Sequence, residues 1–307
     1  AHFSAISSNK ALFARVASVW ENRDKFDLSS EQARVLMLTH RGFVRAGAAL
    51  EGPDDSRMKA IKSRLAVLGT QFAQNLLADE RSWYLPLGED DLQGLPDFVI
   101  DAARSAGSEK NLDGPLITLS RSLIVPFLQF SPRRDLREKA FLAWQARGAN
   151  GGETDNREIA AEILALRQER AQLLGYENFA AYKLETEMAK TPAAVRQLLT
   201  DVWEPAKAQA ERDAAVLTDM MHGEGVNGDL AAWDWRYYAQ KRRVAEHDLD
   251  EAALKPYFQL DRMIDAAFDC ATRLFSLEFT RLEVPLYHAD CRAWEVTRNG
   301  QHVAIFI

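Results

Sequence analysis

Apolar residues recur at steps of three and four over the first 80 positions, and this spacing predicts amphipathic helices. The first predicted helix presents an apolar face between Leu12 and Trp20. The second begins near Ser29, and Gln32 stands at the spacing of a capping box. The third carries a heptad-like stripe typical of antiparallel helix packing, made of Met58, Ile61, Leu65, Leu68 and Phe72. We therefore predict an N-terminal helical bundle over residues 1–82.

The helical pattern stops between residues 83 and 120, which we predict as a mixed connector with short strands. Residues 83–87 are short, aromatic and limited by a proline, so they read as a strand or an extended segment. Residues 97–106 form a short helix. Residues 116–119 are apolar, and we predict that they pair with residues 83–87 as a two-stranded element.

Long helices resume in the main helical region, residues 121–290. One helix ends at Gly175, because glycine is a common stop just past a helix C-terminus. Another begins at the pair Thr191 and Pro192, where threonine caps the helix and proline takes its first position. Pro205 lies inside that helix, and we expect a kink there.

The last segment, residues 291–307, has a strand pattern instead. Trp294–Thr297 and His302–Ile307 flank Asn299 and Gly300, which favours a β-hairpin with a tight turn. The chain ends inside the second strand and starts without a methionine. We therefore expect a truncated hairpin and a partner structure in a longer polypeptide, and the fold class is mainly α.

The composition is that of a globular protein, with 47% hydrophobic and 27% charged residues. The formal net charge of −7 argues against a nucleic-acid partner, which requires a basic face. No apolar run reaches the length of about 18 residues that spans a bilayer, and the N-terminus has no signal-peptide pattern. We predict a cytoplasmic protein without a membrane partner. Cys270 and Cys291 are too few and too far apart for a disulfide framework.

A search for catalytic chemistry finds no motif. No two of the six histidines stand four residues apart, so the H-E-x-x-H zinc motif is absent; they are His2, His40, His222, His247, His288 and His302. Nucleophile elbows and phosphate loops are also absent. Acidic groups such as Asp248–Asp250–Glu251 stand at predicted helix starts or in loops, where they favour the positive end of a helix dipole. We predict no catalytic residue, metal ligand or cofactor within this chain.

The densest aromatic cluster lies between residues 233 and 238, and two interpretations of it stay open. In the first, Asp234 is an N-cap and the aromatic rings pack in the core. In the second, the side chains form the wall of a substrate channel that contacts peptides. The candidate channel residues are Trp233, Asp234, Tyr237 and Tyr238.

Four segments make a resemblance to a known family visible. They are AVLGTQFAQNLLADE (66–80), RRDLREKAFLAWQARG (133–148), the long stretch from Gly151 to Pro192, and WDWRYYAQKRR (233–243). Together the chain resembles the thimet-oligopeptidase-like metallopeptidases, in the details closest to the bacterial peptidyl-dipeptidase branch. The match covers almost the whole chain in the right order, so it is more specific than any single motif.

The resemblance implies one half of a two-lobed, mainly helical peptidase with a deep channel. It implies a zinc ion whose ligands come from an H-E-x-x-H helix and a later glutamate, beyond the segment that resembles Gly300–Ile307. The implied activity is release of C-terminal dipeptides from short peptides, with zinc-polarised water as the nucleophile. The implied partners of this chain are the catalytic C-terminal region of the same polypeptide and short peptides.

Other classes of protein stay open at this stage. The chain could be a catalytically dead helical protein that binds peptides or a partner. It could also be an enzyme without zinc that uses the cluster from Trp233 to Tyr238. An H-E-x-x-H motif downstream in the gene would favour the peptidase.

Overall fold

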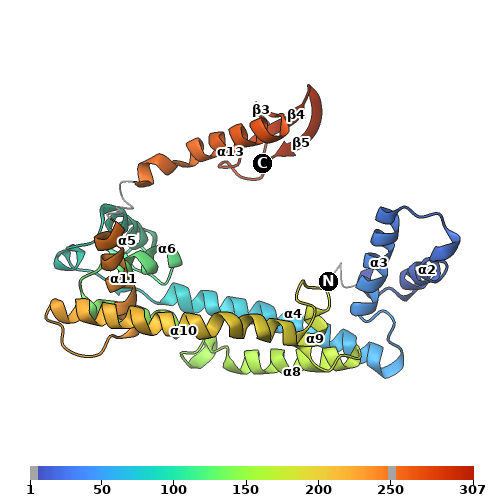
Figure 1. Ribbon diagram of the computed structural model, residues 1–307, viewed down its shortest axis with the longest axis horizontal. Coiled ribbons are helices and arrows are strands. Elements are labelled where there is room, and N and C mark those ends of the chain that lie inside the picture. Colours follow the sequence, from blue (N-terminus) through green and yellow to red (C-terminus); the bar gives the residue numbers. More distant parts are fainter. Residues whose placement is uncertain (1–5, 248–253) are drawn as a thin grey trace. The chain divides into compact units, whose positions relative to one another are not determined.

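The computed structural model describes residues 6–247 and 254–307, and it is mainly helical, as predicted (Figure 1). The chain divides into two compact units, Ala1–Ala239 and Gln240–Ile307. The acidic group Asp248–Asp250–Glu251 and His2 lie outside the described residues. The described helices are α2 (Lys10–Glu21), α3 (Ser30–Arg45), α4 (Gly52–Ser82), α5 (Asp97–Glu109), α6 (Arg121–Phe130), α7 (Arg134–Gln145), α8 (Arg157–Leu173), α9 (Phe179–Leu184), α10 (Pro192–Gly223), α11 (Ala232–His247) and α13 (Leu260–Phe275).

Capping residues set the starts of several helices as the sequence predicts. Ser29 accepts from the Gln32 amide at 3.2 Å and donates its own amide to the Gln32 side chain at 2.9 Å, which completes the capping box of α3. Thr191 caps α10 through the Ala194 amide at 3.2 Å, and Pro192 is the first helical residue. These caps satisfy amides that have no partner inside the helix.

The stripe on α4 packs along α8. Ile61 and Leu68 are fully buried against Ile159 and Leu166 of α8. Arg64 and Glu162 form a two-bonded ion pair at 2.6 and 2.7 Å beside this seam, and Arg57 and Glu169 form another. The sequence pattern groups α4 with the two preceding helices, whereas its long packing partner in the structure is a helix almost 100 residues later.

A core forms around α5, α6 and α7. Its buried residues include Val99 and Ala103 of α5, Ile124 and Phe127 of α6, and Ala140 of α7. Strand β1 (Leu85–Pro86) pairs antiparallel with β2 (Leu116–Ile117), which confirms the predicted two-stranded element.

Helices α10 and α11 meet near their shared connection. Leu217 and Met221 at the end of α10 are fully buried against Tyr237 and Tyr238 of α11. Helix α10 continues as one element through Pro205. These contacts fix the start of α11, which carries the candidate channel residues.

The second unit holds a three-stranded antiparallel sheet in the order β3 (Leu277–Leu282), β4 (Ala293–Arg298), β5 (Gln301–Phe306). The hairpin of β4 and β5 confirms the prediction, and Asn299 and Gly300 have the positive φ angles that its turn requires. Strand β3 is an addition to that prediction. Phe268 of α13 stacks on Phe279 of β3 with ring centroids 4.1 Å apart, which packs the helix on the sheet.

Candidate functional site

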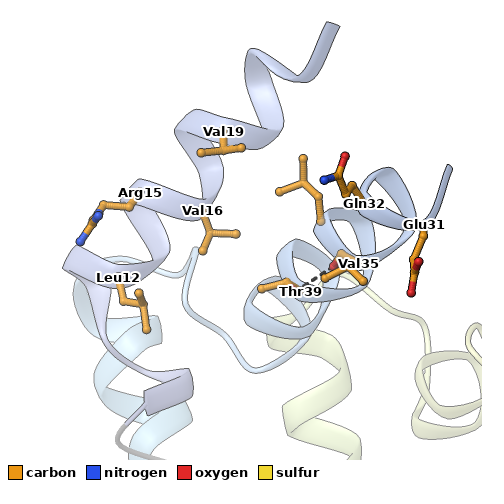
Figure 2. A pocket seen from close by; sticks show the side chains of 9 residues that line it. Leu12, Arg15, Val16, Val19, Glu31, Gln32, Val35 and Thr39 are labelled. Carbon is orange, nitrogen blue, oxygen red and sulfur yellow. Dashed lines mark hydrogen bonds between the residues drawn. The ribbon is translucent and has the colours of Figure 1, made fainter. Parts of the chain in front are cut away.

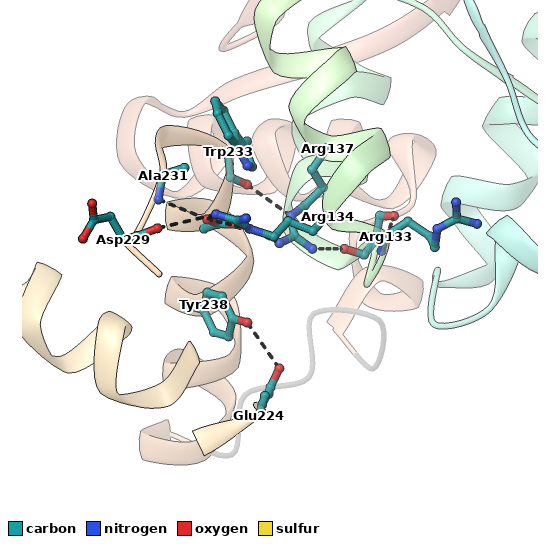
Figure 3. A network of polar contacts seen from close by, with 10 residues as sticks. Arg133, Arg134, Arg137, Glu224, Asp229, Ala231, Trp233 and Tyr238 are labelled. Carbon is teal, nitrogen blue, oxygen red and sulfur yellow. Dashed lines mark hydrogen bonds and ion pairs between the residues drawn. The ribbon is translucent and has the colours of Figure 1, made fainter. Parts of the chain in front are cut away.

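The predicted cluster on α11 is organised around one buried carboxylate, that of Asp234. Figure 3 shows Arg134 and Arg137 of α7 beside Ala231 and Trp233 at the start of α11. Arg134 of α7 contacts both carboxylate oxygens, with Nε and Nη2 distances between 2.8 and 3.1 Å. Arg137, one turn further along α7, donates from Nη2 to Oδ1 at 2.9 Å. The Ala231 amide donates to Oδ2 at 3.0 Å. Three donors from α7 and one from the residue before α11 therefore converge on one side chain.

Asp234 does not cap α11 in the way the sequence suggests. The helix begins at Ala232, so Ala231 stands at the cap position and Asp234 is the third helical residue. Its carboxylate reaches back to the Ala231 amide, which is the reciprocal half of a capping box. The N-cap assignment was wrong by three residues because one aspartate can satisfy free amides from either position.

The buried Arg137 is as fully bonded as the carboxylate it faces. Only 1% of its side chain is exposed. Besides Asp234, it donates to the Ser131 carbonyl at 2.8 Å and to the Trp233 carbonyl at 3.1 Å. Its guanidinium also lies over the Tyr237 ring at 4.2 Å. The pair therefore joins α7 to the first turn of α11.

The electrostatics favour the charged form of Asp234. Burial by itself raises the pKa of this carboxyl group, but the hydrogen bonds from Arg134, the Ala231 amide and Arg137 outweigh it, and the pKa lies below its usual range. The same interaction raises the pKa of the Arg134 guanidinium. An anion that is ionised and fully bonded is suited to holding two helices together, because it has no proton to exchange near neutral pH.

The aromatic members of the cluster are mostly turned into the protein. Tyr237 and Tyr238 are buried and in edge-to-face contact at 5.1 Å, and the Tyr238 hydroxyl lies 3.4 Å from Glu224. Trp233 is half-buried near Phe141. Its indole N–H is enclosed and has no acceptor within the described residues. Three of the four candidate channel residues are thus buried, and Trp233 retains partial exposure.

The arginine partners were absent from the sequence-based site. Arg134 and Arg137 lie in the segment RRDLREKAF, three residues apart, which places both on one face of α7. That spacing was the available signal. Nothing local in the sequence shows that this face meets Asp234, which stands 100 residues later.

A separate apolar groove of about 720 Å³ lies between α2 and α3. Figure 2 shows Leu12, Val16 and Val19 of α2 across from Val35 and Thr39 of α3. Aliphatic side chains make up just over half of its lining, and Arg15, Glu31, Gln32 and Thr39 supply the polar part. The sequence search did not single out this groove, because it read the same stripes as buried bundle contacts.

Metal-binding groups are not found in residues 6–247 and 254–307, where no cluster of three or more His, Cys, Asp or Glu side chains could hold an ion. The described residues therefore do not fit a zinc site. His288 and Asp290 lie on the surface, with the imidazole 3.6 Å from the carboxylate. Within the same residues, no helix is both long and apolar enough to cross a membrane.

The fold is thus mainly helical, with long paired helices and a small antiparallel sheet, and the described residues hold no cluster that could bind a metal ion. The chain belongs to peptidase family M3, whose family model matches residues 127–306, more than half of its length.

The similarity extends to individual relatives. The chain is 35% identical over 303 residues to dipeptidyl carboxypeptidase of Escherichia coli strain K12, which covers 97% of this chain and 44% of that protein. It is 32% identical to oligopeptidase A of the same strain, over 88% of this chain and 40% of the relative. Saccharolysin of Saccharomyces cerevisiae is 26% identical over 89% of this chain and 39% of the relative. The chain spans less than half the length of the curated relatives it matches.

Proposed function

We propose that this chain is the helical, non-catalytic part of a zinc peptidyl-dipeptidase that acts on short peptides. The observation that carries the proposal is the 35% identity to a dipeptidyl carboxypeptidase across 97% of the chain. Release of C-terminal dipeptides is the specificity that this relative's name implies. The cytoplasm is the location we propose for the parent protein, and its substrates are short peptides rather than nucleic acids.

The zinc ion of the parent enzyme is held, in this proposal, by the catalytic C-terminal region of the same polypeptide. The support is indirect: the described residues offer no fitting ligand cluster, and the relatives are more than twice as long as the matched segment. The region that supplies the metal would also supply the nucleophilic water and the general base. The part of the chain described here would position that region and shape the path of the peptide.

Residues 233–238 are, in this proposal, part of the wall of the peptide channel. Trp233 keeps partial exposure, and Trp235 and Arg236 on the same helix are exposed. Asp234, Tyr237 and Tyr238 would hold this wall in place from behind, because each is buried and bonded or packed. A wall fixed by the contact between α7 and α11 cannot shift easily when a peptide enters.

The test is peptide hydrolysis by two proteins, the 307-residue chain and the full product of its gene, each with added zinc. We expect the full product to release C-terminal dipeptides and to lose this activity with a chelator. We expect no release from the 307-residue chain alone. Chelator-sensitive release by that chain, or an inactive full product, would contradict the proposal.

A further inference from the structure

A second apolar groove of the first unit lies between α9 and α10. It has a volume of about 620 Å³, and residues of both helices line it, among them Leu184 of α9 and Val195, Leu199, Val202 and Trp203 of α10. Trp203 and Leu198 are 64% exposed, and Leu199 is 63% exposed. With Val202, which is 58% exposed, they make four neighbouring large apolar side chains open to solvent, which is unusual for a protein surface.

The most exposed large apolar side chains of α10 gather in its first half, although Val216 near the other end is also 40% exposed. At the other end of the same helix, Leu217 and Met221 are fully buried against α11. Apolar residues therefore continue along α10, but α11 covers only those near its C-terminal end. The first half of α10 therefore presents an apolar face that the described residues do not cover.

Two charged side chains line the exposed part of the groove and indicate the charges that a binding segment would carry. Arg196 and Glu204 line the groove, and neither forms an ion pair within the residues that the structure describes. They are eight residues apart, which corresponds to about 12 Å along the helix. An amphipathic helix with an apolar stripe, an acidic residue near Arg196 and a basic residue near Glu204 would complement the groove.

We infer that this groove receives a helix from the part of the M3 peptidase polypeptide that the 307-residue chain does not span. The inference rests on the proposed function, because the relatives supply more than half of their length outside the matched segment. A segment on the same polypeptide has a high effective concentration, so it needs no large independent affinity. The groove would then be an internal packing surface of the complete enzyme and would not contact the substrate.

The experiment compares thermal unfolding of the 307-residue chain and of the full gene product, each with the substitution Leu199→Gln. We expect the full product to lose about 3 °C or more in its unfolding midpoint, because a buried leucine becomes polar. We expect no loss in the 307-residue chain, where Leu199 is exposed. Leu217→Gln is the buried control that lowers both midpoints, and Lys207→Gln on the same helix is the exposed control that lowers neither.

Each alternative result overturns the inference. If Leu199→Gln is neutral in the full product, the groove stays open. If it destabilises the 307-residue chain as well, the chain already covers the groove, either with its own second unit or, where the loss depends on protein concentration, with a second copy. Dipeptide release by the unsubstituted full product is measured in parallel, so an active enzyme with a neutral Leu199→Gln refutes this inference and leaves the proposed function standing.

Discussion

Asp234 loses its hydration on folding, and two guanidinium groups and a backbone amide replace that water. A buried ion pair adds little net stability compared with a well-packed apolar pair. Removal of one partner is a different matter, because the other charge then stays buried without compensation. Arg137 would be in that position, since 1% of its side chain reaches solvent.

Asp234→Asn should therefore lower the free energy of unfolding by about 3 kcal/mol. Urea denaturation followed by circular dichroism measures the change. Asp135→Asn is the matched control, because the Asp135–Arg133 pair is exposed and such pairs contribute at most about 1 kcal/mol. Equal effects of the two substitutions would show that the buried pair does not hold the helices together.

The same carboxylate predicts a pH dependence with a definite sign. The pKa of Asp234 is lower in the folded protein than in the unfolded chain, where it is near its usual value of about 3.9. Its contribution to stability is thus complete above that value and is lost as the pH falls through the folded pKa. Between pH 5 and pH 2, the unsubstituted protein should lose more stability than Asp234→Asn does. Parallel loss in both proteins would assign the acid sensitivity to other groups.

The sequence identified Asp234 and its aromatic neighbours as a cluster, and the structure brings them together. The sequence could not show which way they face. Tyrosine and tryptophan serve equally in a core and in a binding wall, because each has an apolar ring and one polar atom. Tyr237 and Tyr238 face inward because Leu217 and Met221 of α10 pack against them. No pattern in the local sequence shows this contact between two helices.

Several helix and strand boundaries were predictable from a cap or a turn residue, whereas the N-cap assigned to Asp234 was wrong by three residues. Ser29 with Gln32, Thr191 with Pro192, and the turn at Asn299 and Gly300 all work through hydrogen bonds or φ angles within a few residues. Packing partners were not predictable in the same way. The stripe on α4 shows that this helix buries one face, but many later helices could cover it.

The seam between α4 and α8 supports a prediction about packing. Leu68→Ala should cost about 3 kcal/mol of unfolding free energy, because Leu68 is fully buried and its removal leaves a cavity. Leu77→Ala on the same helix changes the same atoms at a position that is 45% exposed, and it should cost less than about 0.5 kcal/mol. Chemical denaturation of both variants gives the comparison. A similar cost for both would mean that helix propensity, rather than burial against α8, explains the effect.

The division into two units has consequences for unfolding of the complete chain. The first unit holds the cores around α5–α7, α4–α8 and α10–α11. The second has its own aromatic cluster, in which Phe268 contacts Phe279, Trp294 and Phe306. Among the described residues of the second unit, Ala293 and Val296 are the buried apolar ones, so its stability rests mainly on this aromatic cluster and the sheet. A unit whose contacts are mainly internal unfolds as a block of its own.

Scanning calorimetry of the 307-residue chain should then resolve two unfolding transitions. Phe268→Ala removes the ring at the centre of the aromatic cluster, so it should lower the temperature of one transition and leave the other in place. Leu68→Ala should act on the other transition alone, because its contacts lie within the first unit. A single transition that both substitutions shift together would show that the two units unfold as one cooperative block. The division between Ala239 and Gln240 would then not separate two parts that unfold independently.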